Sequence, residues 1–195
     1  MEEKGSKQNS FFTLIKFFLF LIVFCFVISI TKEFFREMRS HEGLNINILF
    51  FSALSAFSFY TFVVDLNGVY KKIQNFFFHS SFLSYLIPSF LILMGIGYFI
   101  LPKAFNLEID KEIFVFLGGF VVTSHLIFVA RDNKGKTFSG VINYLFNFSI
   151  LYIISLLLFS VYLMAAFEIN LSKILVDGLT NGAMLIKNLF NQVLH

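Results

Sequence analysis

The chain has 195 residues, of which 57% are hydrophobic and only 14% are charged, and its formal net charge is +3. Together with a mean hydropathy of +0.81, this composition leaves too little polar surface for a soluble domain of this length. Soluble globular classes are therefore excluded, and we expect lipid to be the main solvent of the chain.

Apolar stretches close to twenty residues long predict transmembrane helices, because roughly 20 helical residues are needed to cross about 30 Å of hydrocarbon. The predicted spans are Phe11–Thr31, Ile46–Val64, Phe82–Leu101, Ile113–Ala130 and Val141–Phe167. Barrel strands alternate apolar and polar residues, whereas Phe17–Phe24 is apolar on every side. The predicted fold class is an all-α integral membrane protein with a bundle of about five transmembrane helices.

The first span follows a polar tail at residues 1–10 and opens the transmembrane helical domain, residues 11–167. Its apolar run is too long for a signal-peptide core, so we expect it to be retained. Four crossings are the alternative, with the first helix continuing through Thr31–Arg39, supported by Glu33 and Glu37 at i,i+4 and by a stop at Gly43. That extension is expected at the membrane interface, with its large apolar residues dipping into lipid: Phe34, Phe35 and Met38.

Packing signals occur in the second, third and fourth spans. Small residues at i, i+3 and i+4 form a stripe in the second span, and a glycine pair lies in the fourth, where other helices can approach closely. These residues are Ser52, Ser55, Ala56, Gly118 and Gly119. We expect contacts within the bundle or between copies of the chain, and we expect Pro88 to kink the third span or shape its first turns.

One ionisable residue, His125, is predicted inside a span. Buried charge in hydrocarbon is expensive and usually functional. A lone histidine, however, is commonly hydrogen-bonded to a neighbouring helix. We carry both interpretations forward: a structural hydrogen bond, or a gating or pH-sensing role.

A basic turn joins the fourth and fifth spans. Gly135-Lys136-Thr137 lacks the glycine that a phosphate-binding loop needs five residues earlier, where Ala130 stands, and no strand precedes it. Arg131, Lys134 and Lys136 are therefore interpreted either as solvated anchors or as a site for anionic lipid headgroups or an acidic partner surface.

The segment 168–195 is predicted to be an amphipathic C-terminal helix. Apolar residues recur at helical spacing between Leu171 and Leu194, opposite Lys173 and several amides. Gly178 and Gly182, four residues apart beside the apolar face, favour a close helix contact. We expect this helix to lie flat on the membrane or to pack against a sister subunit or a partner.

No constellation for catalysis is visible in the sequence. Hydrolysis needs a nucleophile with its base, paired acids or converging metal ligands, and His41, His79 and His195 lack metal-ligand spacing. The lone Cys25 cannot form an intramolecular disulfide. We expect no catalytic residue, no metal site, no cofactor and no direct contact with nucleic acid.

Basic residues are divided almost evenly between alternate connections, and a small excess places the N-terminus in the cytoplasm, in a bacterial inner membrane. The predicted function is a non-enzymatic multi-pass membrane subunit that forms homo-oligomers or binds a partner protein, and anchors or senses for it. The alternative is a small oligomeric ion channel or transporter whose path is lined by hydroxyl residues of the second span and by His125. In size and span number the chain is similar to the membrane component of the Kiwa anti-phage system, a similarity that implies a sensor subunit of a bacterial defence complex.

Overall fold

The computed structural model describes residues 2–41, 43–62, 66–77, 81–106, 109–132 and 138–194, and every regular element in these ranges is an α-helix. In chain order the helices are α1 (Glu2–Ser40), α2 (Ile46–Phe62), α3 (Leu66–Phe77), α4 (Ser81–Leu86), α5 (Ser89–Phe105), α6 (Lys111–Asp132), α7 (Phe138–Leu163) and α8 (Leu171–Leu194). The all-α class predicted from the sequence is confirmed.

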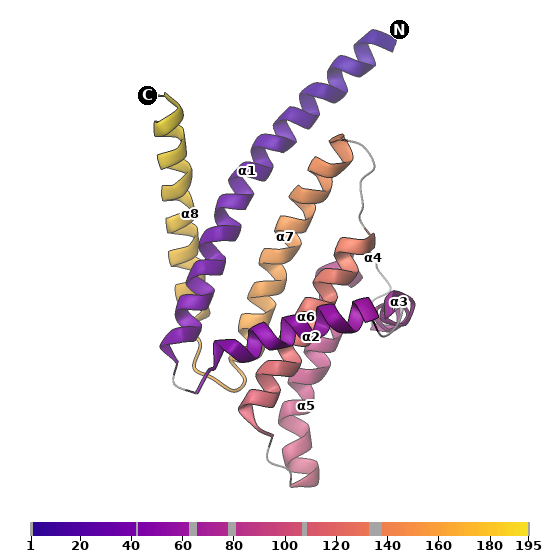
Figure 1. Cartoon of the computed structure of the whole chain (residues 1–195), viewed down its shortest axis with the longest axis vertical. Coiled ribbons are helices and arrows are strands. Elements are labelled where there is room, and N and C mark those ends of the chain that lie inside the picture. The colour runs from indigo at the N-terminus through magenta and orange to yellow at the C-terminus, as the bar shows by residue number, and fades with distance from the viewer. Residues whose placement is uncertain are drawn as a thin grey trace.

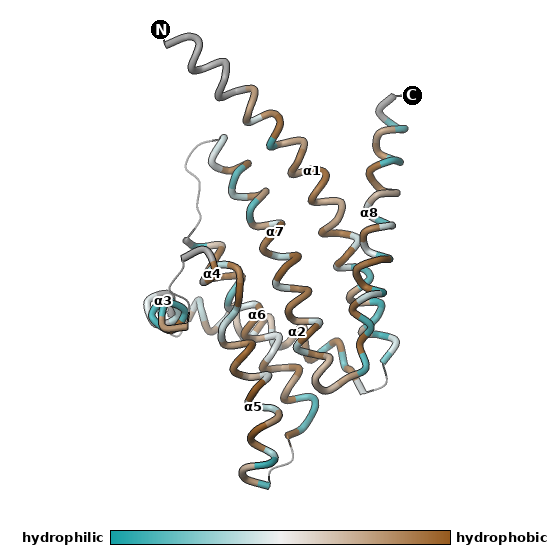
Figure 2. The backbone as a smooth tube through the Cα atoms, turned by 180° about the vertical axis from the view of Figure 1, so that it is seen from behind, coloured by the Kyte–Doolittle hydropathy of each residue, from teal (hydrophilic) through white to brown (hydrophobic). Residues whose placement is uncertain are grey.

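The helices are arranged along a long axis (Figure 1). α1, α7 and α8 run along that axis, with the N- and C-termini toward the same end, while α2, α5 and α6 gather toward the other end. α1 packs against α8 and α7, and α2 packs against α6. Hydrophobic residues cover most of α1, α5 and α7, whereas α8 alternates between hydrophobic and hydrophilic residues (Figure 2).

Three helices are long and apolar enough to cross a membrane: Phe11–Ser40, Lys111–Arg131 and Ser139–Leu163. α2 and α5 are apolar but have 17 residues each, which gives a length of about 25 Å at 1.5 Å per residue. The predicted third span is divided at Pro88, because proline has no N–H to continue the helix and its ring clashes with the preceding turn. The predicted count of five spans is therefore not confirmed.

The first helix continues beyond its apolar stretch as far as Ser40, and Gly43 follows with a φ of 87°, in the region that glycine favours. Contrary to expectation, Phe34 and Met38 do not face outward toward lipid. Both are fully buried in the core, and the Phe34 ring lies 5.9 Å from the ring of Phe159 in α7. The expected contact of these side chains with lipid was wrong, because α7 packs over this part of α1.

Helix α3 was not predicted from the sequence. It contains Lys71 and Lys72 and lies in the connection between the second and third predicted spans. It is a short amphipathic helix: both lysines are exposed, while Tyr70 and Gln74, one turn apart, are buried on the opposite face. A search for apolar runs overlooks such a helix because half of its surface is polar.

Two adjacent glycines let α6 pack closely between α2 and α7. A Cβ at Gly118 would overlap Tyr162 and lie 2.9 Å from a ring carbon of Phe159, both in α7. A Cβ at Gly119 would overlap Ser52 and lie 3.1 Å from Leu49, both in α2. Ala56 is also fully buried in α2, and Ser55 is half-buried.

Helix α8 packs along α1 of the same chain, an arrangement that was not among those expected from the sequence. An added Cβ at Gly178 would lie 2.8 Å from Ile30, and one at Gly182 would lie 2.5 Å from Phe26. Because glycine has no side chain, the two helix backbones approach closely at these positions. The two glycines of α8 therefore lie in a contact with α1 of the same chain.

Candidate functional site

The core of the bundle contains a buried polar cluster centred on His125, which we call the histidine network. His125 Nε2 lies 2.9 Å from the carbonyl oxygen of Tyr85, and His125 Nδ1 lies 2.9 Å from the hydroxyl of Tyr70. Gln74 Nε2 donates to the same hydroxyl at 3.0 Å. The network thus joins α6 to α3 and to the last turn of α4, and all three side chains are buried.

The partners of His125 define its tautomer. A carbonyl oxygen can only accept, so Nε2 carries the proton that is donated to Tyr85, and in the neutral imidazole Nδ1 accepts from Tyr70. Burial raises the pKa of the Tyr70 hydroxyl, so the hydroxyl stays protonated and can donate. Both imidazole nitrogens are therefore engaged, and the histidine connects three helices.

The break at Pro88 makes this arrangement accessible. Pro88 has φ −71° and ψ 95°, an extended conformation that separates α4 from α5. The carbonyl groups in the last turn of a helix have no N–H donor within the same helix. Tyr85 lies in the last turn of α4. The carbonyl of Tyr85 consequently accepts a hydrogen bond from α6.

The histidine network leaves one acceptor atom unused. Gln74 Oε1 is buried without a hydrogen-bond partner in the described part of the chain. If the amide of Gln74 turned over, Oε1 could accept from Tyr70, and the Tyr70 oxygen could then accept from a protonated Nδ1. The gating or pH-sensing role of His125 stays a hypothesis, and it would require such a rearrangement.

A second polar cluster, which we call the glutamate cluster, lies between α1 and α8. Glu33 and Glu37 are only 3% and 5% exposed and lie one turn apart on the face of α1 toward α8. Glu33 accepts from Asn181 Nδ2 at 3.0 Å, and Glu37 accepts from Lys173 Nζ at 2.9 Å. The sequence placed both glutamates in an interfacial extension, so their burial is a correction.

Glu37 also holds the start of α8. Its Oε1 accepts from the backbone N–H of Asn170 at 3.1 Å and lies 3.3 Å from Nε2 of His41. Asn170 caps α8, because its side-chain oxygen accepts from the backbone N–H of Lys173 at 3.0 Å. A carboxylate is stabilised beside a helix N-terminus by the helix dipole. The i,i+4 spacing of the glutamates was visible in the sequence, but their partners in α8 were not.

The basic turn is described at one of its three predicted positions. The guanidinium of Arg131 donates to the carbonyl of Tyr60 at 3.4 Å and lies 5.6 Å from the centroid of the Tyr60 ring. It therefore binds the C-terminal end of α2, where a positive charge is favourable. Lys134 and Lys136 lie outside the described residues.

Two of the residues that the channel hypothesis placed along a path, Ser52 and His125, make their hydrogen bonds inside the bundle. Ser52 is fully buried against Gly119, and its hydroxyl donates to the carbonyl of Leu49 at 2.7 Å. His125 is likewise engaged at both nitrogens. Within the described ranges, no group of three His, Cys, Asp or Glu side chains is placed to hold a metal ion.

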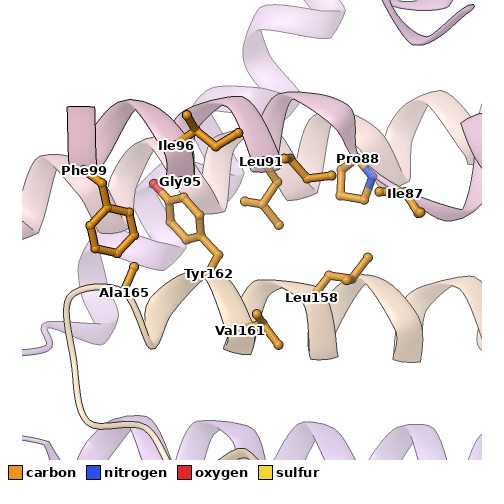
Figure 3. A pocket seen from close by; sticks show the side chains of 11 residues that line it. Ile87, Pro88, Leu91, Gly95, Ile96, Phe99, Leu158, Val161, Tyr162 and Ala165 are labelled. Carbon is orange, nitrogen blue, oxygen red and sulfur yellow. The ribbon is translucent and has the colours of Figure 1, made fainter. Parts of the chain in front are cut away.

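An apolar groove of about 280 Å³ lies between α5 and α7 (Figure 3). Tyr162 extends from α7 toward Gly95 of α5, and an added Cβ at that glycine would lie 3.6 Å from the tyrosine ring. The hydroxyl of Tyr162 donates to the carbonyl of Phe114 at 2.9 Å, so it is already satisfied. The groove consequently has the character of a helix-packing or lipid-facing surface.

No protein-family model, curated protein or solved structure matches the chain. The functional interpretation therefore depends on the geometry of the buried clusters, the grooves and the exposed apolar surfaces.

Proposed function

We propose that the chain is a non-enzymatic, multi-pass membrane subunit that assembles with further copies or with a partner protein, and anchors or senses for that partner. Its three candidate spans support a place in the bilayer. Within this proposal, the protein lies in a bacterial inner membrane with its N-terminus in the cytoplasm. Membership of a defence complex is a narrower form of the same proposal, supported by size and predicted span number alone.

The observation that carries the proposal is an apolar wedge between α1 and α8. The two helices pack together at Gly178 and Gly182 and separate toward the chain termini (Figure 1). Between them lies a space of about 350 Å³ with apolar walls from both helices. The walls include Phe18, Leu21, Ile22, Cys25, Leu189 and Phe190.

The wedge suits a helix from another chain. Helices in lipid associate through van der Waals packing and interhelical hydrogen bonds rather than through apolar burial. A helix entering the wedge would contact α1 and α8 together. The same end of α8 also exposes the amide side chains of Asn188 and Gln192, which can bond to a polar group of a neighbouring helix.

Cysteine cross-linking tests the proposal, because Cys25 is the one cysteine in the sequence. In a Cys25→Ser background, Phe18→Cys places a thiol at the wedge, and Phe105→Cys places a matched one at the exposed end of α5. A bismaleimide applied to native membranes should give a covalent dimer, or an adduct with a co-purifying protein, through Phe18→Cys alone. Equal cross-linking at both positions, together with a monomeric mass in mild detergent, would refute the proposal.

The channel or transporter alternative has no specific observation in its favour. The hydroxyl of Ser52 and both nitrogens of His125 have partners inside the bundle. Flux measurements on reconstituted protein remain its direct test, and solute or ion flux that scales with protein amount would reinstate it.

A further inference from the structure

A cavity of about 260 Å³ lies among α2, α3, α5 and α6, separate from the α1–α8 wedge. Its walls are dominated by aromatic rings, from Phe59, Tyr60, Tyr70, Phe90 and Phe120. None of the residues that line it is charged. A pocket with mostly apolar walls and a few polar groups is the usual form of a small-molecule site.

Two hydroxyl side chains that line the cavity have no hydrogen-bond partner among the described residues. Tyr60 is 5% exposed and Ser124 is 6% exposed, and neither Tyr60 Oη nor Ser124 Oγ is bonded. Buried polar groups are nearly always satisfied in folded proteins, so each exception calls for a partner. A hydroxyl has one hydrogen to donate and lone pairs that can accept, and a single acceptor atom placed between the two hydroxyls would satisfy both O–H donors.

The aromatic side chains that line this cavity are fixed in place by ring contacts and hydrogen bonds. The Tyr70 ring lines the cavity and packs 5.6 Å from the Phe90 ring and 4.9 Å from the Phe128 ring. Its hydroxyl points into the histidine network, where it bonds to His125 and Gln74. On the other side, the Phe59 and Phe120 rings meet edge to face at 5.9 Å. The ring surfaces are therefore arranged before any ligand enters.

We propose that this cavity binds a neutral, lipid-soluble ring compound that carries a carbonyl oxygen. The rings of the compound would pack on the aromatic walls, and its carbonyl oxygen would accept hydrogen bonds from Tyr60 and Ser124. The absence of charge in the lining favours a neutral ligand. A dry cavity of about 150 Å³ holds benzene, so the larger volume here accommodates one or two substituted rings. This inference is independent of assembly through the α1–α8 wedge.

Photolabelling with benzophenone tests the inference, because this probe is itself a two-ring aromatic ketone. Purified protein in detergent would be irradiated over a range of probe concentrations and the adducts mapped by mass spectrometry. We expect saturable labelling at the lining residues Met94 and Leu117. Diphenylmethane has the same two rings without the carbonyl oxygen and should compete at least about threefold more weakly, as expected for the loss of one hydrogen bond.

Variants of the cavity distinguish hydrogen bonding to the probe from non-specific labelling of apolar surface. Tyr60→Phe and Ser124→Ala should each raise the half-saturating concentration by about threefold to tenfold. Ser155→Ala is the matched control, since Ser155 Oγ is also buried and unbonded but lies in α7, outside the cavity lining. The inference is overturned if labelling does not saturate, if it maps to the α5–α7 groove, or if diphenylmethane competes equally well. It is also overturned if Tyr60→Phe and Ser124→Ala both label like the unmodified protein.

Discussion

Gly118 lies where α6 approaches α7, and its replacement by alanine tests whether this close approach stabilises the fold. The added Cβ would overlap Tyr162 and lie 2.9 Å from Phe159. The Tyr162 ring has little freedom to move, because it stacks on Phe114 at 4.0 Å and its hydroxyl bonds to the Phe114 carbonyl at 2.9 Å. The methyl group must therefore displace a held ring or push the two helices apart.

The expected size of the effect follows from these contacts. Overpacking a filled core costs about 1–3 kcal/mol, and loss of the Tyr162 hydrogen bond adds about 1 kcal/mol. Replacing glycine by alanine within a helix returns about 1 kcal/mol. The free energy of unfolding should consequently fall by about 1–3 kcal/mol in Gly118→Ala.

Thermal unfolding in detergent, followed by far-UV circular dichroism, measures this change. Each kcal/mol corresponds to about 2–4 °C in Tm for a chain of this size. Gly97→Ala in α5 is the control, because its Cβ would meet no atom closer than 3.8 Å, and its Tm should stay equal or rise. A Gly118→Ala protein that melts at or above the unmodified protein would refute the reasoning.

Two further predictions concern the buried polar clusters. Lys173→Ala leaves the carboxylate of Glu37 buried without its ion pair, so stability should fall by about 1–3 kcal/mol. Adding Glu37→Gln to that variant should recover part of the loss in denaturant titrations, whereas additive losses would show that the pair is not coupled. Tyr70→Phe removes the hydrogen bond to His125 and should lower stability by about 1–3 kcal/mol in the same titrations. Tyr144→Phe, at a half-buried position in α7, should change stability by less than about 0.5 kcal/mol, and equal losses in the two variants would contradict the proposed role of the network.

Helices with a strong local pattern were predictable. Long apolar runs indicated α1, α6 and α7, and the spacing of apolar residues from Leu171 to Leu194 indicated α8. Helix α3 was missed because its lysines resemble a solvated connection. Its buried face depends on the bond between Tyr70 and His125, which lie 55 positions apart in the sequence. A local pattern contains no information on such a partner.

Burial of the charged side chains in the glutamate cluster could not be predicted from the local sequence either. Glu33 and Glu37 stand among exposed Lys32, Arg36 and Arg39, and the pattern favours a solvated segment. Burial of Glu37 is stabilised by groups 133 and 136 positions away, at the cap and in the first turn of α8. The cost of burying a carboxylate is offset only when these distant donors are in place.

Hydropathy and helical periodicity act within a few turns of chain, so the amino-acid order was sufficient to establish an all-helical protein with membrane-compatible helices and an amphipathic end. The choice of which helix faces pack together depends on contacts between residues far apart in the chain. Gly118 allows close packing against α7 and Gly119 against α2, while Gly178 and Gly182 allow close packing against α1. The same long-range packing brings Tyr60 and Ser124 to one aromatic cavity and opens the wedge between α1 and α8. The candidate sites of this protein therefore form only on folding, because residues from more than one helix line each of them.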